Sequence, residues 1–272
     1  MSYNALLQDI RHKKFAPVYF LHGPESYFID RITDAIEEYA LAEHERAFNQ
    51  TMLYGKDTDH LQVLDAARRF PMMAERQLVI LKEAQDMKNL KDLQTYLEKP
   101  TPTTVLVICH KHKKYALNTN FGKAVKAHAV LFESATLYDN QVPDWIGGYL
   151  KDKQLTASPE IRELLAEYLG AELSKVANEL DKLALNVPAG ATLTAEMVEQ
   201  HIGVSKDYGV FEFQKALGLR DIVKSNRIIQ YFIANPRKNP CHRLLAAFTI
   251  ISARYTCITG CPRFRNRRYY RL

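Results

Sequence analysis

Residues 1–140 alternate short, wholly apolar runs with longer segments in which apolar residues recur every three or four positions. The short runs are typical of buried strands, and the longer period is that of an amphipathic helix. Wholly apolar strands favour a parallel sheet that is covered on both faces. The pattern therefore predicts an α/β domain over about residues 1–140. Its expected strands are 17–21, 48–53, 77–81, 104–109 and 129–132.

From about residue 141 the pattern changes to helical periodicity alone, and we expect no further strands. Ser158-Pro159 and Thr194 begin two of these helices with residues suited to helix N-termini. The sequence thus predicts a small helical domain over 141–208 and a further helical segment over 209–272. The expected helices are 142–153, 159–169, 171–186, 194–201, 210–218, 221–235 and 241–255.

A candidate phosphate loop follows the first predicted strand. A working loop of this kind has a second glycine, a lysine that neutralises the phosphates, and a hydroxyl that holds Mg²⁺. The sequence Gly23-Pro24-Glu25-Ser26 is followed by none of these. Pro24 lacks an N–H donor, and Glu25 brings a negative charge to the place of a phosphate. We therefore predict a degenerate, non-functional phosphate loop.

A second departure from nucleotide hydrolases follows the strand 77–81. Such enzymes usually have Asp-Glu after this strand, one carboxylate for the metal and one to polarise water. This chain has Lys82-Glu83, so a cation stands at the position of the metal ligand. The missing phosphate-loop residues and the missing metal-binding carboxylate argue independently against ATP hydrolysis. The pattern alone leaves open that the domain was never a nucleotide-binding fold.

Three blocks of sequence carry a resemblance to a known family. They are PVYFLHGPESYFIDR (17–31), ARRFPMMAERQLVILKEA (67–84) and LSKVANELDKLAL (173–185), and YGVFEFQKALGLRD (208–221) extends the similarity. On these residues the chain resembles the delta subunit of bacterial DNA polymerase III, which opens the sliding clamp as part of the clamp loader. The resemblance covers about residues 1–250.

The resemblance implies an AAA+-like fold with three parts. These would be a RecA-like domain (1–140) with a degenerate phosphate loop and a clamp-binding tip, a helical lid domain (141–208) and a partial helical collar domain (209–272). It also implies a non-catalytic, cytoplasmic subunit of a DNA-directed DNA polymerase holoenzyme, without a cofactor. The implied partners are the sliding clamp, ATP-hydrolysing motor subunits, a second inactive subunit, and primer–template DNA through the complex.

In the family, two adjacent apolar residues at a helix tip fill a hydrophobic pocket on the clamp. Here they align with Met72 and Met73, which follow Phe70-Pro71. Methionine is unbranched and adapts well to a partner's pocket, although the family usually carries Leu-Phe-like residues here. The alternative interpretation is that both methionines pack beneath the strand 77–81 within their own domain.

The net charge of +6 is concentrated at one end of the chain. Residues 254–272 contain six arginines and neither lysine nor acid, whereas the remaining chain carries 31 residues of each sign. The charge balance does not indicate a basic nucleic-acid-binding body. We expect this end to be truncated or to arise from a changed reading frame. The alternative functions are a basic-aromatic tail that binds nucleic acid and a P-loop-type ATPase.

Other sequence features exclude further classes. No apolar stretch approaches the ~20 residues that a membrane span needs, and the N-terminus lacks a signal-like apolar region. Cys109, Cys241, Cys257 and Cys261 are too few for a disulfide scaffold and suit a reduced cytoplasm. A zinc site that joins Cys109 and its neighbouring histidines to the distant Cys257 and Cys261 is not expected. Residues 110–114 are interpreted as a solvated strand end, near DNA or a neighbouring subunit.

Overall fold

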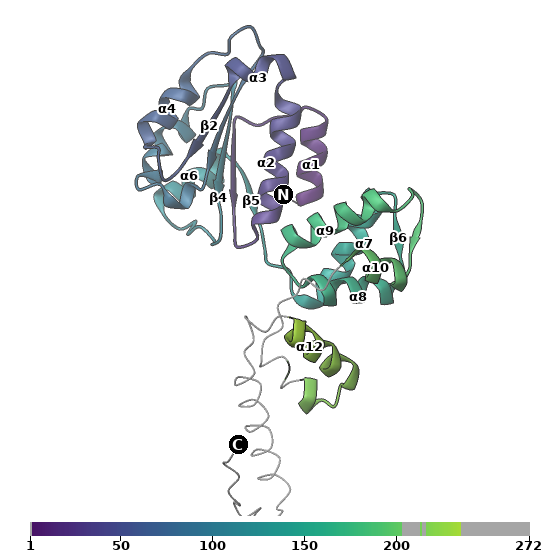
Figure 1. Cartoon of the computed structure of the whole chain (residues 1–272). Coiled ribbons are helices and arrows are strands. Elements are labelled where there is room, and N and C mark those ends of the chain that lie inside the picture. Colours follow the sequence, from purple (N-terminus) through teal and green to yellow (C-terminus); the bar gives the residue numbers. More distant parts are fainter. Residues whose placement is uncertain (1, 203–212, 214–215, 235–272) are drawn as a thin grey trace, which may run out of the picture. The chain divides into compact units, whose positions relative to one another are not determined.

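The computed structural model describes residues 2–202, 213 and 216–234 (Figure 1). The chain divides into two compact units, Met1–Val142 and Pro143–Leu272. Each unit is described here by itself.

The first unit is built on a five-stranded parallel sheet, as the apolar runs predicted. Its strands run in the order β2-β3-β4-β1-β5, and every neighbouring pair is parallel. Parallel strands end at the same edge, so residues after β1, β3 and β4 lie close together there. The strands are β1 (Val18–His22), β2 (Gln50–Tyr54), β3 (Gln77–Lys82), β4 (Thr104–His110) and β5 (Val130–Glu133).

Helices cover both faces of this sheet (Figure 1). Successive residues of β1, β3 and β4 enter opposite cores, which is why these three strands are mostly apolar. Tyr19 and Leu21 pack with α1 (Tyr3–Arg11) and α2 (Ser26–Ala40). Phe20 packs on the other face against residues of three further helices and two 3₁₀ segments. These are α4 (His60–Arg68), η1 (Ala84–Asp86), η2 (Leu90–Leu93), α5 (Gln94–Glu98) and α6 (Asn120–His128).

The sequence prediction missed three helices in this unit, of which α5 has only five residues. The expected strand 48–53 begins only at Gln50, because α3 (Glu43–Asn49) continues through Asn49. The helix α6 was not predicted, although Thr119 caps it by accepting a hydrogen bond from the Gly122 N–H. All three helices have fewer than ten residues, so their apolar periodicity is short.

The second unit is mainly helical, as expected, and its N-caps follow the sequence. The Ser158 side chain caps α8, where Pro159 is the first helical residue, and Thr194 caps α10. The expectation of no strands after residue 140 is wrong, because two residues at 156–157 and two at 192–193 form a short parallel pair. The elements are α7 (Val142–Asp152, which begins at the boundary), β6 (Thr156–Ala157), α8 (Pro159–Leu169), α9 (Leu173–Asn186), β7 (Thr192–Leu193), α10 (Ala195–His201) and α12 (Ile222–Ala234).

Several predicted features lie outside the described residues. These are the helix predicted at 241–255, most of the one at 210–218, the arginine-rich stretch 254–272 and Cys241, Cys257 and Cys261. Within the described part of the chain, no helix is long and apolar enough to cross a bilayer.

Candidate functional site

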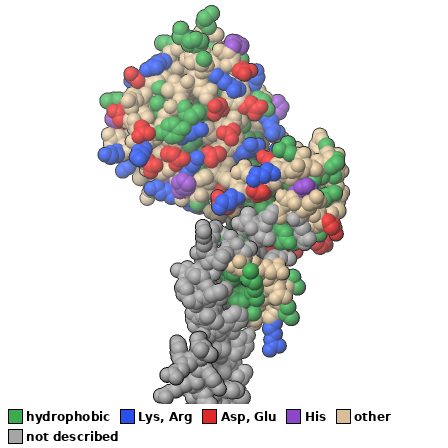
Figure 2. Space-filling model, viewed as in Figure 1, with side chains coloured by type: hydrophobic (Ala, Val, Ile, Leu, Met, Phe, Trp, Pro, Cys, Tyr) green, Lys and Arg blue, Asp and Glu red, His purple; other side chains and the backbone are tan. Residues whose placement is uncertain are grey.

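The loop between α4 and β3 carries the apolar residues that the family resemblance singled out. We call Phe70, Pro71, Met72 and Met73 the apolar tip. Met73 is fully exposed, Met72 is 64% exposed and Phe70 is 83% exposed. In Figure 2, hydrophobic side chains protrude from the first unit at the end where Figure 1 shows α3. Both methionines therefore lie outside the core, and the alternative that they pack beneath β3 does not hold.

A buried asparagine fixes the main chain of the apolar tip. The side chain of Asn49, at the end of α3, is only 4% exposed. Its Nδ2 donates to the Met72 carbonyl at 2.9 Å, and its Oδ1 accepts from the Met72 N–H at 2.6 Å. Nδ2 also donates to the Glu45 carbonyl at 3.1 Å within α3. The tip is thus tied to a neighbouring helix through main-chain groups, which leaves its apolar side chains free.

A second polar network holds the end of the helix that precedes the tip. The last carbonyls of a helix have no partner within it. Gln77 Nε2, at the start of β3, donates to the Arg69 carbonyl at 2.5 Å and to Thr104 Oγ1 at 2.8 Å. Thr104 Oγ1 donates in turn to the Ala67 carbonyl at 2.8 Å. Because Gln77 and Thr104 are both buried, this network fixes where the chain leaves α4.

The backbone of Met73 has a left-handed conformation, with φ of +52°. This conformation costs a non-glycine residue about 1–2 kcal/mol. The bonds that Asn49 makes to Met72 and the Gln77 network define the chain on both sides of Met73. The surrounding structure thus maintains the turn that exposes the Met73 side chain completely.

Sequence reasoning found the tip but missed Asn49, Gln77 and Thr104. Gln77 and Thr104 stand at the starts of predicted strands, where a polar residue is unremarkable. Asn49 was assigned to a strand, although it ends a helix. Nothing local in the sequence marks these side chains as buried, because their partners are main-chain groups from distant segments.

The segment predicted to be a degenerate phosphate loop lies between β1 and α2. Gly23 has φ of +141°, and a Cβ there would lie 2.1 Å from the Ser134 carbonyl oxygen, so the close approach of the chain requires glycine. Glu25 is the N-cap of α2, and its Oε1 accepts from the Tyr27 N–H at 3.1 Å. A helix N-terminus of this kind is where phosphate binds in other proteins. Here the chain's own carboxylate bonds to it.

Lys111, which follows β4, lies at the same carboxyl edge of the sheet as this loop. Lys111 Nζ lies 2.7 Å from Asp30 and 3.3 Å from Glu83, and its side chain is 12% exposed. Burial lowers the pKa of Lys111, but the hydrogen bond and charge of Asp30, with Glu83, outweigh it and raise the pKa above its usual value. The interpretation of 110–114 as a solvated strand end is therefore wrong for Lys111 and for His110, which is 4% exposed.

The acidic partner Glu83 is part of the same cluster. Burial raises its pKa, but the hydrogen bond from Gln85 and the charge of Lys111 have the larger combined effect, so its pKa is lowered. Its Oε2 also lies 3.9 Å from His112 Nε2, and Ser26 Oγ lies 3.4 Å from His112 Nδ1. The polar groups at the edge where a nucleotide would bind are therefore paired with one another.

The candidate metal ligand Cys109 is buried in the sheet. Burial raises the pKa of its thiol to about 11, although a hydrogen bond with Thr33 lowers it somewhat. Its Sγ lies 3.2 Å from Thr33 Oγ1. The residues that the structure describes contain no group of three or more side chains suited to hold a metal ion.

These features define a class of protein. An open parallel sheet between two helical layers, followed by a mainly helical second unit, characterises a parallel α/β protein with many helices. Residues 19–135 match the model of the family described as DNA polymerase III, delta subunit.

Two known proteins extend this match beyond the first unit. The delta subunit of DNA polymerase III from Bacillus subtilis (strain 168) is 25% identical, over 96% of this chain and 77% of that protein. The solved structure of the Bacillus subtilis DNA clamp loader delta protein superimposes with a TM-score of 0.68 at 22% identity, covering 96% of this chain and 81% of that one. The resemblance to the delta subunit of DNA polymerase III is confirmed.

Proposed function

We propose that this chain is the clamp-opening subunit of a DNA polymerase III clamp loader, and that it binds the sliding clamp through the apolar tip. The observation that carries the proposal is the exposure of Met72 and Met73 on a loop whose main chain is fixed. An exposed apolar group on a rigid support is suited to enter a pocket on a partner. The matched Bacillus subtilis structure is itself called a DNA clamp loader delta protein.

The energetics of such a contact are favourable. Fully burying one methionine side chain stabilises an interface by about 1.5–3 kcal/mol, so the pair contributes roughly 3–6 kcal/mol. Because Asn49 already orders the loop, little conformational entropy is lost on binding. The tip opens the ring only if the open clamp accepts these side chains better than the closed clamp does.

We further propose that the subunit does not hydrolyse ATP. The Glu25 carboxylate at the N-terminus of α2 and the cation Lys82 at the end of β3 both support this. The motor subunits of the loader would then provide ATP hydrolysis, alongside a second inactive subunit, and primer–template DNA would be reached through the complex. In this proposal residues 1–140 are the RecA-like domain, 141–208 the lid and 209–272 the collar, and the protein acts in the cytoplasm.

Release of a loaded clamp tests the opening activity. The cognate clamp is placed on a circular DNA, the full chain is added without nucleotide, and the clamp that remains on DNA is measured by gel filtration. We expect the chain to bind the clamp and release it from the circle. Binding without release would contradict the opening role, and absence of binding would contradict the whole proposal.

A further inference from the structure

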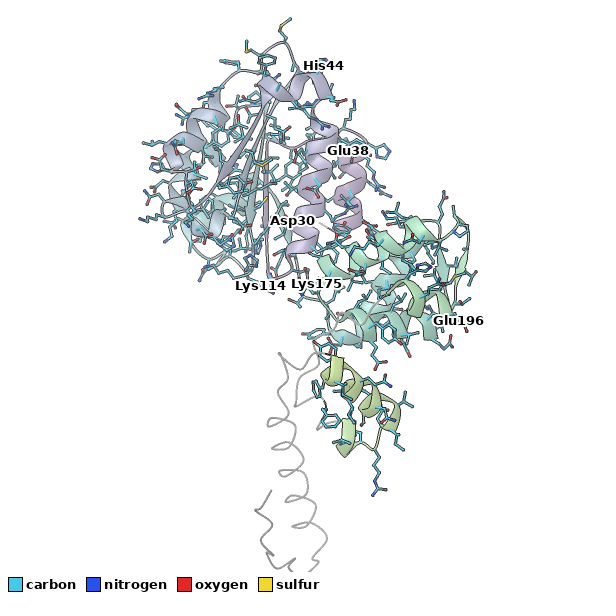
Figure 3. All side chains as sticks on the ribbon, in the orientation of Figure 1. Asp30, Glu38, His44, Lys114, Lys175 and Glu196 are labelled. Carbon is cyan, nitrogen blue, oxygen red and sulfur yellow. The ribbon has the colours of Figure 1, made fainter. Side chains whose placement is uncertain are left out.

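A pocket of about 290 Å³ lies at the carboxyl edge of the sheet in the first unit. One wall is the segment 84–91 after β3, and the other is the segment 110–116 after β4. Figure 3 labels Lys114 of the second segment at the opposite end of this unit from His44 of α3. The pocket is therefore well separated from the apolar tip, which Asn49 ties to α3.

The charge in the wall of this pocket is of one sign. Four lysines and no acidic residue line the pocket, which we call the lysine pocket. Lys114 pairs with Glu133 at 2.5 Å. In the part of the chain that the structure describes, the other three lysines form no ion pair. Cations that surround a concave surface concentrate their potential within it. The lining lysines are Lys88, Lys91, Lys113 and Lys114.

A buried histidine adds a polar group to the same wall. His110 is 4% exposed and lines the pocket. Its Nδ1 lies 3.2 Å from the Lys113 carbonyl oxygen, which only accepts, so Nδ1 carries the proton of that bond. Among the described residues, the second ring nitrogen, Nε2, has no hydrogen-bond partner. A ligand in the pocket can therefore form a hydrogen bond with this nitrogen.

Part of the pocket lining is apolar. Ala84, Met87 and Leu90 are buried in the core of the first unit, and each also lines the pocket. Tyr115 lies edge-on to the His110 ring, with centroids 5.3 Å apart. The cations thus surround a preformed hollow, which distinguishes the site from lysines scattered on an open surface.

We propose that the lysine pocket binds a phosphate group. Phosphate carries the charge that lysine ammonium groups bind, and a protonated phosphate oxygen can donate to His110 Nε2. The group can come from a free phosphate compound or from a DNA backbone, which share the negative charge that the lysines bind. A backbone phosphodiester carries no proton near neutral pH, so only a free phosphate compound can also donate to His110 Nε2. The site adjoins the loop at Gly23, whose N–H donates to the His110 carbonyl at 3.3 Å, but other segments line it. It does not depend on the clamp contact of the apolar tip.

The test follows the His110 ring by ¹³C–¹H NMR of the full chain labelled at histidine. Pyrophosphate is titrated in one arm and a short DNA duplex in the other, at constant ionic strength. The pocket variant is the double substitution Lys91→Ala and Lys113→Ala. The matched control is Lys123→Ala with Lys126→Ala, which removes the same charge from exposed positions on α6.

We expect at least one probe to shift the His110 resonance, with an affinity reduced about tenfold or more in the pocket variant and less than about twofold in the control. Binding of pyrophosphate alone identifies a free phosphate compound as the ligand. Displacement of pyrophosphate by the duplex identifies a DNA backbone. If neither probe shifts His110, or if both variants lose affinity equally, the proposal is wrong. All four substituted lysines are exposed, so melting curves should show that the variants fold normally.

Discussion

Asn49 and Met72 exchange two hydrogen bonds, so a buried side chain at the end of α3 holds the main chain of the apolar tip. The two residues are 23 positions apart in the sequence. Asn49 uses only main-chain atoms of Met72. The side chains of the tip are therefore not needed for this support.

Replacing Asn49 with alanine should weaken clamp binding, although Asn49 itself is buried. The change leaves the Met72 N–H and carbonyl without their partner, which costs about 1–3 kcal/mol when such groups stay buried. The loop must then be ordered on binding, so clamp affinity falls as well. Calorimetric titration against the clamp and urea denaturation measure the two effects. The control is Asn89→Ala, because the exposed Asn89 side chain makes no cap bond. An unchanged affinity in Asn49→Ala would show that the tip needs no such support.

Gln77→Leu should destabilise the first unit by about 1–3 kcal/mol. Leucine has a similar volume but no N–H groups, so the Arg69 carbonyl and Thr104 Oγ1 lose a donor. Urea denaturation of the full chain measures this loss. Gln8→Leu on the exposed side of α1 serves as the control and should change stability by less than about 0.5 kcal/mol. Equal effects from the two substitutions would show that the network contributes nothing specific.

Two glycine substitutions should have opposite effects. Gly23→Ala places a methyl group 2.1 Å from the Ser134 carbonyl oxygen at a φ of +141°, so we expect a loss of more than about 2 kcal/mol. Gly148 lies inside α7 with nothing within 4 Å of an added Cβ. Gly148→Ala should therefore stabilise its helix by roughly 0.5–1 kcal/mol. Melting curves of the two variants decide this, and a tolerated Gly23→Ala would contradict the close approach of β1 and the chain after β5.

Acidification below neutral pH should destabilise the first unit through its buried histidines. Burial lowers the pKa of His22 and His110 from the ordinary value of 6.5. The unfolded chain therefore binds protons at a higher pH than the folded chain, and stability falls as the pH drops through about 6.5. Denaturation at pH 7.5 and 5.5 measures the effect.

The variant His22→Asn measures how much the His22 ring contributes to this pH dependence of stability. His22 Nδ1 accepts from the Tyr115 N–H at 3.1 Å, and asparagine Oδ1 can take over that role. We expect the variant to lose less stability between the two pH values than the unmodified chain does. His128→Gln, at an exposed position of α6, should leave the pH dependence unchanged. An identical pH dependence in His22→Asn would show that His22 is not a source of this effect.

The strands of the sheet and several helix starts could be predicted from the sequence, because local patterns of residues determine them. Wholly apolar runs marked four strands of the parallel sheet, whereas the remaining strand, β2 (QTMLY), was predicted two residues too early from a mixed segment. Ser158 and Thr194 marked helix starts correctly. The pair β6 and β7 was missed because two residues carry no periodicity. Family resemblance, and not periodicity, pointed to Met72 and Met73.

Features that depend on distant partners could not be predicted. Lys111 is charged and follows a strand, which is typical of a solvated position. It is buried because Asp30 of α2 and Glu83 after β3 meet it at the sheet edge. Asn49 is polar, and only the arrival of Met72 from another segment explains its burial. The lysine pocket likewise forms only when the segments after β3 and β4 lie side by side.

The affinity of the clamp for a chain with Met72→Ala and Met73→Ala tests the central claim most directly. The control is Leu185→Ala, which removes an apolar side chain that is 87% exposed in the second unit. Surface plasmon resonance measures the dissociation constant of each chain, and melting curves check its fold. We predict an affinity loss of about 100-fold or more for the double variant, no loss for the control, and nearly unchanged melting temperatures. A double variant that binds the clamp as tightly as the unmodified chain would contradict the account.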